Sequence, residues 1–314
     1  MKTIAILSLC GAVALGAPAA SDRTLAADAV VRTISFSPDG KTLVASYEDD
    51  HVRTWDVDSG KPVDDRALGG YLLNSGYLLQ ASDPTWNSAR VWDLAADRQK
   101  LTINSPLSYV AMSADRKQLA VNLPGERVVQ LLNSATGERR HVLADGLSSA
   151  AALVFSPDGS TLVSTNYDND VRIWKTQSGE LVRKIESFTG AMFTAAFTAD
   201  GRELVMGGLD ETVYIFDTRT YGLKRSLKGH GETIQALAIS PDGGTLVTGG
   251  FDVVAEKNPV KLVFWDLAAG TIVRTVRAPH AISTLEFSSD GKWLAMAANG
   301  SKEISLFSLS PTTR

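Results

Sequence analysis

The chain has 314 residues, of which 44% are hydrophobic and 21% are charged, and its formal net charge is −4. This composition provides enough apolar material for a large buried core and is unlike that of a disordered chain. The mildly negative charge argues against nucleic acid as a partner, because contacts with phosphates need a basic surface.

The first twenty residues differ in composition from the rest of the chain. Lys2 is followed by an uncharged apolar run from Ile4 to Leu15 and by small residues up to Ala20. A positive start, about a dozen apolar residues and an Ala-x-Ala end are typical of a secretory signal peptide, whereas a membrane span needs about 20 apolar residues. We therefore expect residues 1–19 to be removed, leaving a secreted or periplasmic protein without a membrane span. An uncleaved N-terminal anchor is the alternative.

The single cysteine, Cys10, lies inside this leader. Leu9 is too large for the small residue that a lipoprotein signal has at this position, so the pattern does not indicate a lipid anchor. A mature chain without cysteine excludes disulfide bonds, thiol catalysis, iron–sulfur clusters and covalently attached c-type haem. Removal of Lys2 with the leader makes the net charge more negative by one.

After the leader, the sequence is built from one repeated unit, which is clearest between Leu153 and Gly179. Its pattern predicts three short strands, at residues 153–155, 161–165 and 171–174, because β-branched and aromatic residues favour a half-buried pleated surface. The first two strands are joined by residues 156–159, Ser-Pro-Asp-Gly. Proline presets the bend of this turn and glycine tolerates positive φ.

Copies of this unit occur along the whole chain. The first turn recurs at residues 36–40, 197–201, 239–243 and 287–291, with a degraded copy at 112–116. The third strand ends at Trp55, Trp92, Leu132, Trp174, Phe216, Trp265 and Phe307, which are separated by 37 to 49 residues. Seven copies at this spacing match the period of a four-stranded propeller blade.

The units follow one another without a linker. The first unit spans residues 31–68, and the second, which is the least regular, starts at residue 71. The next three units span residues 109–142, 153–185 and 195–227. The sixth unit has an insertion at 253–259, and the last unit ends near residue 309. The last unit has only three strands. We expect residues 22–26 to supply its fourth strand, because closing the ring in this way removes two open strand edges.

Three Trp-Asp pairs, at 55–56, 92–93 and 265–266, and one Gly-His pair, at 229–230, occupy fixed places in these units. They resemble the WD-repeat β-propeller family, and the resemblance covers nearly all of the chain after the leader. It implies an all-β fold in which residues 20–314 form one propeller of seven four-stranded antiparallel blades, closed by pairing of the N-terminal strand with the last blade.

The resemblance also implies a structural chain of hydrogen bonds in the sixth unit, through His230, Thr248, Asp252 and Trp265. His-Thr-Asp invites comparison with a catalytic triad, but the matching residues are structural in this family, and function has to be argued from a site's geometry.

Other groups that could carry chemistry have simpler explanations. Asp39, Asp158, Asp242 and Asp290 lie in separate turns, where aspartate bonds its own backbone. The four histidines, His51, His141, His230 and His280, lack zinc-binding spacing. Neither residues 49–51 nor 166–170 match a calcium-binding loop. We predict no catalytic residue, no metal and no cofactor.

The better functional candidate is the face formed by the turns between second and third strands and by the loops entering each blade. It would present Tyr47, Glu48, Asp50, His51, Trp86, Tyr167, Asn169, Leu209, Glu211, Phe251 and the insertion at 253–259. Aromatic side chains surrounded by charge are typical of protein interfaces. Single exposed apolar residues also occur on ordinary surfaces, which is the alternative interpretation.

We predict a monomeric, non-catalytic platform that binds an unidentified protein, because members of the WD-repeat family mostly act as docking platforms. One alternative is an exported enzyme or enzyme subunit resembling lactonases or quinoprotein dehydrogenases. Another is a subunit of an envelope assembly or transport machine. Several His, Arg and carboxylate side chains converging at one mouth of the central channel would favour the enzyme, and small residues there would favour the platform.

Overall fold

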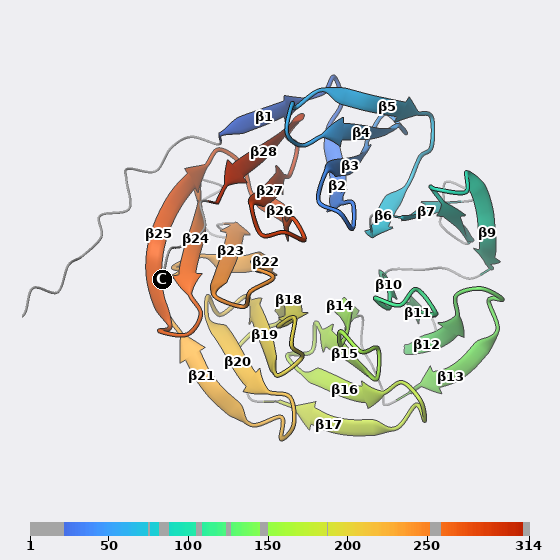
Figure 1. The fold of residues 1–314 in the computed structure, drawn as a ribbon. Coiled ribbons are helices and arrows are strands. Elements are labelled where there is room, and N and C mark those ends of the chain that lie inside the picture. Colours follow the sequence, from blue (N-terminus) through green and yellow to red (C-terminus); the bar gives the residue numbers. More distant parts are fainter. Residues whose placement is uncertain are drawn as a thin grey trace, which may run out of the picture.

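The computed structural model describes residues 22–74, 76–81, 88–104, 109–123, 127–144, 150–186, 188–251 and 259–309. Within these ranges all 28 secondary-structure elements are β-strands, and they form seven four-stranded sheets around a common axis (Figure 1). No helix long and apolar enough to cross a membrane occurs in these ranges. The prediction of an all-β propeller with seven blades is confirmed.

In the first three blades the strands follow chain order from the axis outward, and each pairs antiparallel with the next. Blade 1 contains β2 (Val31–Phe36), β3 (Thr42–Tyr47), β4 (Val52–Asp56) and β5 (Pro62–Arg66). Blade 2 contains β6 (Tyr71–Asn74), β7 (Tyr77–Ala81), β8 (Ala89–Asp93) and β9 (Arg98–Ile103), and blade 3 contains β10 (Tyr109–Met112), β11 (Gln118–Leu123), β12 (Val128–Asn133) and β13 (Arg139–Leu143).

The remaining blades repeat this order, except that the last one borrows a strand from the start of the chain. Blade 4 contains β14 (Ala150–Phe155), β15 (Thr161–Asn166), β16 (Val171–Lys175) and β17 (Leu181–Ile185), and blade 5 contains β18 (Met192–Phe197), β19 (Glu203–Gly208), β20 (Val213–Asp217) and β21 (Leu223–Leu227). Blade 6 contains β22 (Thr233–Ile239), β23 (Thr245–Phe251), β24 (Val260–Asp266) and β25 (Thr271–Ala278), and blade 7 contains β26 (Ile282–Phe287), β27 (Trp293–Ala298), β28 (Glu303–Ser308) and β1 (Arg23–Ala26).

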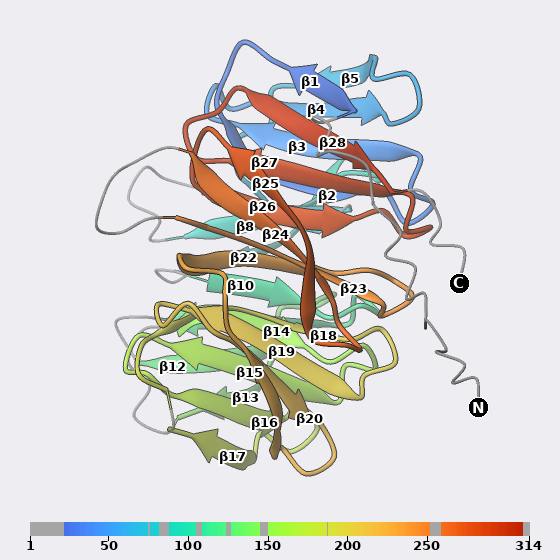
Figure 2. The same cartoon turned by 90° about the vertical axis from the view of Figure 1, so that its left-hand side faces the viewer.

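The pairing of β1 with β28 closes the ring, as the sequence predicted. Arg23 lies opposite Leu306 and Leu25 lies opposite Ile304, and the two strands run side by side when the ring is seen from its edge (Figure 2). The carboxylate of Asp22 accepts a hydrogen bond from the Ser308 amide at 2.6 Å. The side chain of Leu25 is buried in the core between blades 7 and 1, so the closure is apolar as well as hydrogen-bonded.

The Ser-Pro-Asp-Gly turn explains why the first two strands of a blade meet. In blade 4, Ser156 Oγ donates to the Asp158 carboxylate at 2.6 Å and accepts from the Thr161 amide at 3.0 Å, while Gly159 takes a φ of 70°. In the corresponding turns of blades 1, 3, 5, 6 and 7, a serine or threonine hydroxyl likewise donates a hydrogen bond to the turn aspartate. Hydrogen bonds from Ser156 and the Ser160 amide lower the pKa of Asp158. These carboxylates therefore serve their own turns.

The two irregular units also form blades. Blade 2 has all four strands although its first turn is shortened. In blade 3, Arg116 replaces the turn glycine with a φ of 61°, and its guanidinium lies 5.6 Å from the ring centroid of Tyr77 in blade 2. The degraded turn persists because Ser113 still donates to Asp115 at 2.7 Å.

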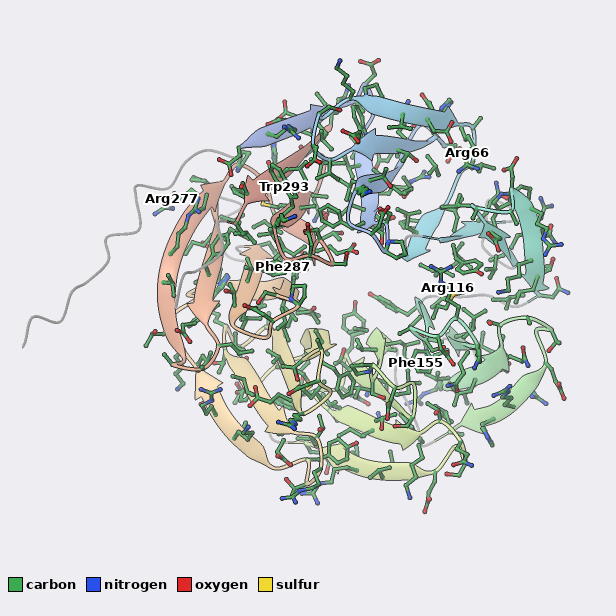
Figure 3. The ribbon with its side chains drawn as sticks, in the orientation of Figure 1. Arg66, Arg116, Phe155, Arg277, Phe287 and Trp293 are labelled. Carbon is green, nitrogen blue, oxygen red and sulfur yellow. The ribbon has the colours of Figure 1, made fainter. Side chains whose placement is uncertain are left out.

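The hydrophobic core lies between neighbouring blades. One cluster joins Leu131 and Leu143 of blade 3 to Leu162 and Trp174 of blade 4, and the other clusters join blades in the same way. Figure 3 shows the contrast between Phe287, on an inner strand near the axis, and Arg277, on the outer strand β25 at the rim. Each blade thus depends on its neighbours to bury its faces, which is the physical basis of repeat folds.

Candidate functional site

Three equivalent turns form the surface that the sequence singled out. The end of β3 pairs with the start of β2, as Tyr47 with Val31, so the turns between second and third strands lie at the same end of the blades as the start of each inner strand. We call this end the upper face and define it by the turns 48–51, 167–170 and 209–212, in blades 1, 4 and 5, together with the first residues of the inner strands.

The three turns share one backbone shape. Asp50, Asn169 and Glu211 occupy the same turn position, and their φ angles are 61°, 63° and 61°. Asparagine and aspartate tolerate this left-handed conformation better than most residues. The first residue of the turns in blades 4 and 5 is consequently presented to solvent, with Tyr167 51% exposed and Leu209 44% exposed. Glu48 holds the same position in blade 1 and is also exposed.

Tyr47 does not belong to this face, and the prediction that it does is wrong. Its side chain is 0% exposed because β3 continues through residue 47 and turns this side chain into the core. The Tyr47 hydroxyl accepts a hydrogen bond from Trp55 Nε1 at 3.1 Å, and the Arg53 guanidinium lies 4.6 Å from its ring centroid. Burial raises the pKa of Tyr47 to about 12. The Tyr47 side chain therefore lies in the core beneath the turn 48–51.

The other predicted face residues have different surroundings. Asp50 accepts from Arg32 at 2.9 Å, and the half-buried His51 has its Nδ1 2.6 Å from Asp65. Phe251 ends β23 opposite Thr233 and is half-buried. Trp86, Asp252 and residues 253–258 lie outside the described residues.

The structure adds two aromatic residues to the face that the sequence did not single out, Tyr109 of β10 and Phe193 of β18. The ring centroids of Phe193 and Tyr167 are 6.0 Å apart, and Tyr109 is a neighbour of Tyr167 on its other side. Burial and this neighbour raise the pKa of Tyr109. Phe193 lies at a β-bulge between Met192 and Thr194, and bulges redirect side chains. Tyr167 is therefore held by residues of both adjacent blades.

A buried polar network holds the same turn from below. Asp170 is the last residue of the turn in blade 4. Its Oδ1 accepts hydrogen bonds from the Arg172 guanidinium at 2.7 Å and from the Asn166 side-chain amide at 2.6 Å, and Lys184 Nζ lies 3.4 Å from its Oδ2. The side chains of Asp170 and Arg172 are only 5% and 3% exposed. Desolvation raises the pKa of Asp170 in spite of these donors. Loss of either Asp170 or Arg172 would leave the other charge buried without a partner, which is energetically costly. The network therefore holds the turn in this conformation.

A second aromatic position lies on blades 1 and 2. The ring of Tyr71, at the start of β6, is exposed, and the Arg32 guanidinium lies 5.6 Å from its centroid. Glu48 and Glu211 form no ion pair within the described part of the chain, so the exposed aromatic and apolar side chains are accompanied by unneutralised carboxylates.

Two of the four residues in the predicted hydrogen-bonded chain are in direct contact. Trp265 Nε1 donates to Thr248 Oγ1 at 2.8 Å, and both side chains are buried. His230 is fully buried, its Nδ1 lies 3.0 Å from the Glu232 carbonyl, and burial lowers its pKa to about 4. Blade 4 has a comparable bond, from Trp174 Nε1 to Ser164 at 3.3 Å. The role of Asp252 stays a prediction.

We expect Thr248→Val to lower the free energy of unfolding by about 1 to 3 kcal/mol, because it leaves the buried indole N–H of Trp265 without its acceptor. Thr248→Ser keeps the hydroxyl and is the matched control. Urea denaturation measures both variants. Equal losses in the two would contradict a role for the hydrogen bond.

Taken together, these features define a seven-bladed β-propeller with a rigid upper face bearing exposed aromatic and acidic side chains. The family model described as "WD domain, G-beta repeat" matches residues 21–56, 138–175 and 222–252. Together with the seven phased repeats and the observed fold, this match supports a WD-repeat β-propeller family for this chain.

Comparison with curated proteins gives partial alignments. The chain is 31% identical over 142 residues to the uncharacterized WD repeat-containing protein sll1491 of Synechocystis, covering 43% of this chain and 41% of the relative. It is 28% identical over 155 residues to transcription factor unc-37 of Caenorhabditis elegans, covering 46% and 25%. These alignments span less than half of either relative.

Among solved structures, the β-propeller domain of Cps50 (Swd1) from Myceliophteria thermophila superposes with a TM-score of 0.78. The alignment covers 93% of this chain and 100% of that domain at 18% identity, and this similarity shows the fold alone.

Proposed function

We propose that this protein is a non-catalytic docking platform that binds another protein through its upper face, in the periplasm or outside the cell. The observation that carries the proposal is the pair of exposed side chains Tyr167 and Leu209 on adjacent blades, of which Tyr167 is held in place by Tyr109 and Phe193. An aromatic anchor that is already ordered loses little entropy on binding, and such anchors dominate interface energies.

The charges around these anchors suggest the partner's chemistry. Glu211 is exposed beside Leu209, and Asp168 and Asn169 are exposed beside Tyr167. A complementary partner would insert apolar side chains between the two turns and place Lys or Arg residues at their edges, since such charges mainly set specificity and association rate.

The inner strands support a platform over an enzyme of lactonase or quinoprotein-dehydrogenase type. Across the seven inner strands, β2, β6, β10, β14, β18, β22 and β26, the only charged residues are Arg32 and Glu286. Arg32 is near the upper end of β2 and pairs with Asp50, whereas Glu286 is near the opposite end of β26. Within the described residues, no group of three or more His, Cys, Asp or Glu side chains could hold a metal ion.

Affinity capture tests the upper face. We expect the double variant Tyr167→Ala and Leu209→Ala to lose at least tenfold in capture of the partner from envelope extracts or culture medium, because it removes both anchors. The matched control is Val63→Ala with Leu223→Ala, which truncates two exposed apolar side chains on outer strands. Equal capture by both double variants would reject the upper face as the binding surface.

Export is tested separately. We expect the mature protein to begin at Ala20, because the leader pattern places cleavage after Ala19. N-terminal sequencing of protein recovered from the periplasm or the medium measures this directly. Recovery of the full-length chain in the cytoplasm alone would reject the proposed location and leave the docking test intact.

A further inference from the structure

Glu286, on the inner strand of blade 7, occupies a position where other blades have small or uncharged residues. It is the second residue before the serine or threonine that opens the first turn. In the other five blades with this turn, the equivalent residues are Ser35, Ala111, Val154, Ala196 and Ala238. A carboxyl group at this one position therefore departs from the repeat.

The Glu286 carboxylate bridges the two blades that meet at the closure of the ring. Its Oε1 accepts a hydrogen bond from Ser35 Oγ at 3.2 Å and another from the Phe36 amide at 3.2 Å, both on β2. Both donors bond the same oxygen. Oε2 makes no hydrogen bond within the described part of the chain, and the side chain is half-buried, so this oxygen can accept from a ligand.

In the part of the chain that the structure describes, no cationic side chain pairs with this carboxylate. The strands packed against β26 are β2, β22, β23 and β27, and the only ionisable side chain on these four is Arg32, which pairs with Asp50 at the far end of β2. Desolvation consequently raises the pKa of Glu286 to about 7. A half-buried carboxylate without a countercharge is stabilised by any cation that reaches it.

We propose that Glu286 is the anionic anchor of a binding site for a primary alkylammonium group, from either a free polyamine or a lysine side chain. The inner strands are sheet edges, and edge strands present unpaired backbone carbonyls that can accept the remaining ammonium hydrogens. The equivalent residues on the next two inner strands are alanines, Ala238 on β22 and Ala196 on β18. A calcium or magnesium ion fits less well, because it needs about six oxygen ligands.

The test is calorimetric titration of the folded protein at pH 8 with 1,5-diaminopentane and, separately, with an end-blocked Gly-Lys-Gly peptide. We expect Glu286→Gln to weaken binding at least tenfold, the effect of losing one charge-assisted hydrogen bond. Glu138→Gln, which removes an exposed carboxylate on blade 3, is the matched control and should leave affinity unchanged. 1-Pentanol, which has no charge, should not bind.

The pH profile separates the proposed site from a merely structural residue. Wild-type affinity should fall as the pH is lowered from 8 to 6, because Glu286 takes up a proton while the amine stays charged, and the affinity of Glu286→Gln should not change. Tighter binding of the diamine identifies a free polyamine as the ligand, and tighter binding of the peptide identifies a lysine side chain. Equal affinities of wild type and Glu286→Gln, or no binding of either amine to the wild type, would overturn the proposal.

Discussion

Replacing Leu25 with alanine is expected to lower the free energy of unfolding by about 3 kcal/mol, in the range measured for buried leucines. Leu25 is 1% exposed and packs between blades 7 and 1, where β1 completes the last sheet. The loss includes both the apolar contact and the cavity that alanine leaves. Urea denaturation followed by circular dichroism measures it as a shift of the midpoint.

The matched control for this prediction is Leu223→Ala on the outer strand β21. Leu223 is 55% exposed, so the same change in side chain should alter stability by less than about 0.5 kcal/mol. If Leu25→Ala proved as stable as Leu223→Ala, the closure of the ring by β1 would contribute little to the folded state, contrary to the packing described above.

A second large effect concerns the pH dependence of stability, because the half-buried Glu286 and the buried His230 change it in opposite directions. Folding raises the pKa of Glu286 from 4.5 to about 7, so its contribution to stability is fully present below pH 4.5 and is lost as the pH rises to 7. Folding lowers the pKa of His230 from 6.5 to about 4, so its contribution is present above pH 6.5 and is lost as the pH falls to 4.

The two dependences cancel between about pH 4.5 and 6.5. In this window the unfolded chain carries one proton on His230, whereas the folded chain carries one on Glu286, so these two groups bind the same number of protons in both states. We expect Glu286→Gln to lose roughly 2 to 3 kcal/mol of stability as the pH falls from 7 to 4.5, because the His230 dependence is then no longer offset by Glu286.

His230→Asn should show the opposite slope. Its stability is expected to fall by roughly 2 to 3 kcal/mol as the pH rises from 5 to 7.5, because the Glu286 dependence is then no longer offset by His230. The measurement is the free energy of unfolding in urea at half-unit pH intervals for wild type and both variants. Parallel curves for all three proteins would contradict the assignment of these slopes to Glu286 and His230.

The fold was predictable from the sequence because its signals are local and repeated. Each Ser-Pro-Asp-Gly turn and each Trp-Asp pair marks a definite place in a blade, and a missing fourth strand at the end points to residues 22–26. The strand boundaries were less predictable. β14 begins at Ala150, three residues before the predicted start, because small residues at the crowded axis carry no β-strand signal.

The candidate site was less predictable because it depends on which way single side chains point. Tyr47 precedes the turn by one residue, and in a strand a shift of one residue moves a side chain from solvent to core. Tyr109 and Phe193 were missed because their proximity to Tyr167 spans three blades, and the bulge that redirects Phe193 leaves no motif. Glu286 could have been found by aligning the inner strands of the repeats, where it alone is charged at its position.

The closure between β1 and β28 also sets the order in which the molecule can be completed. Among the strands of the described residues, β1 comes first in the chain and its partner, β28, comes last. A growing chain therefore keeps two unprotected sheet edges until residues 303–308 have emerged. Removing either β1 or β28 should leave the closing sheet with an unpaired edge, so both deletions are expected to give an aggregation-prone species.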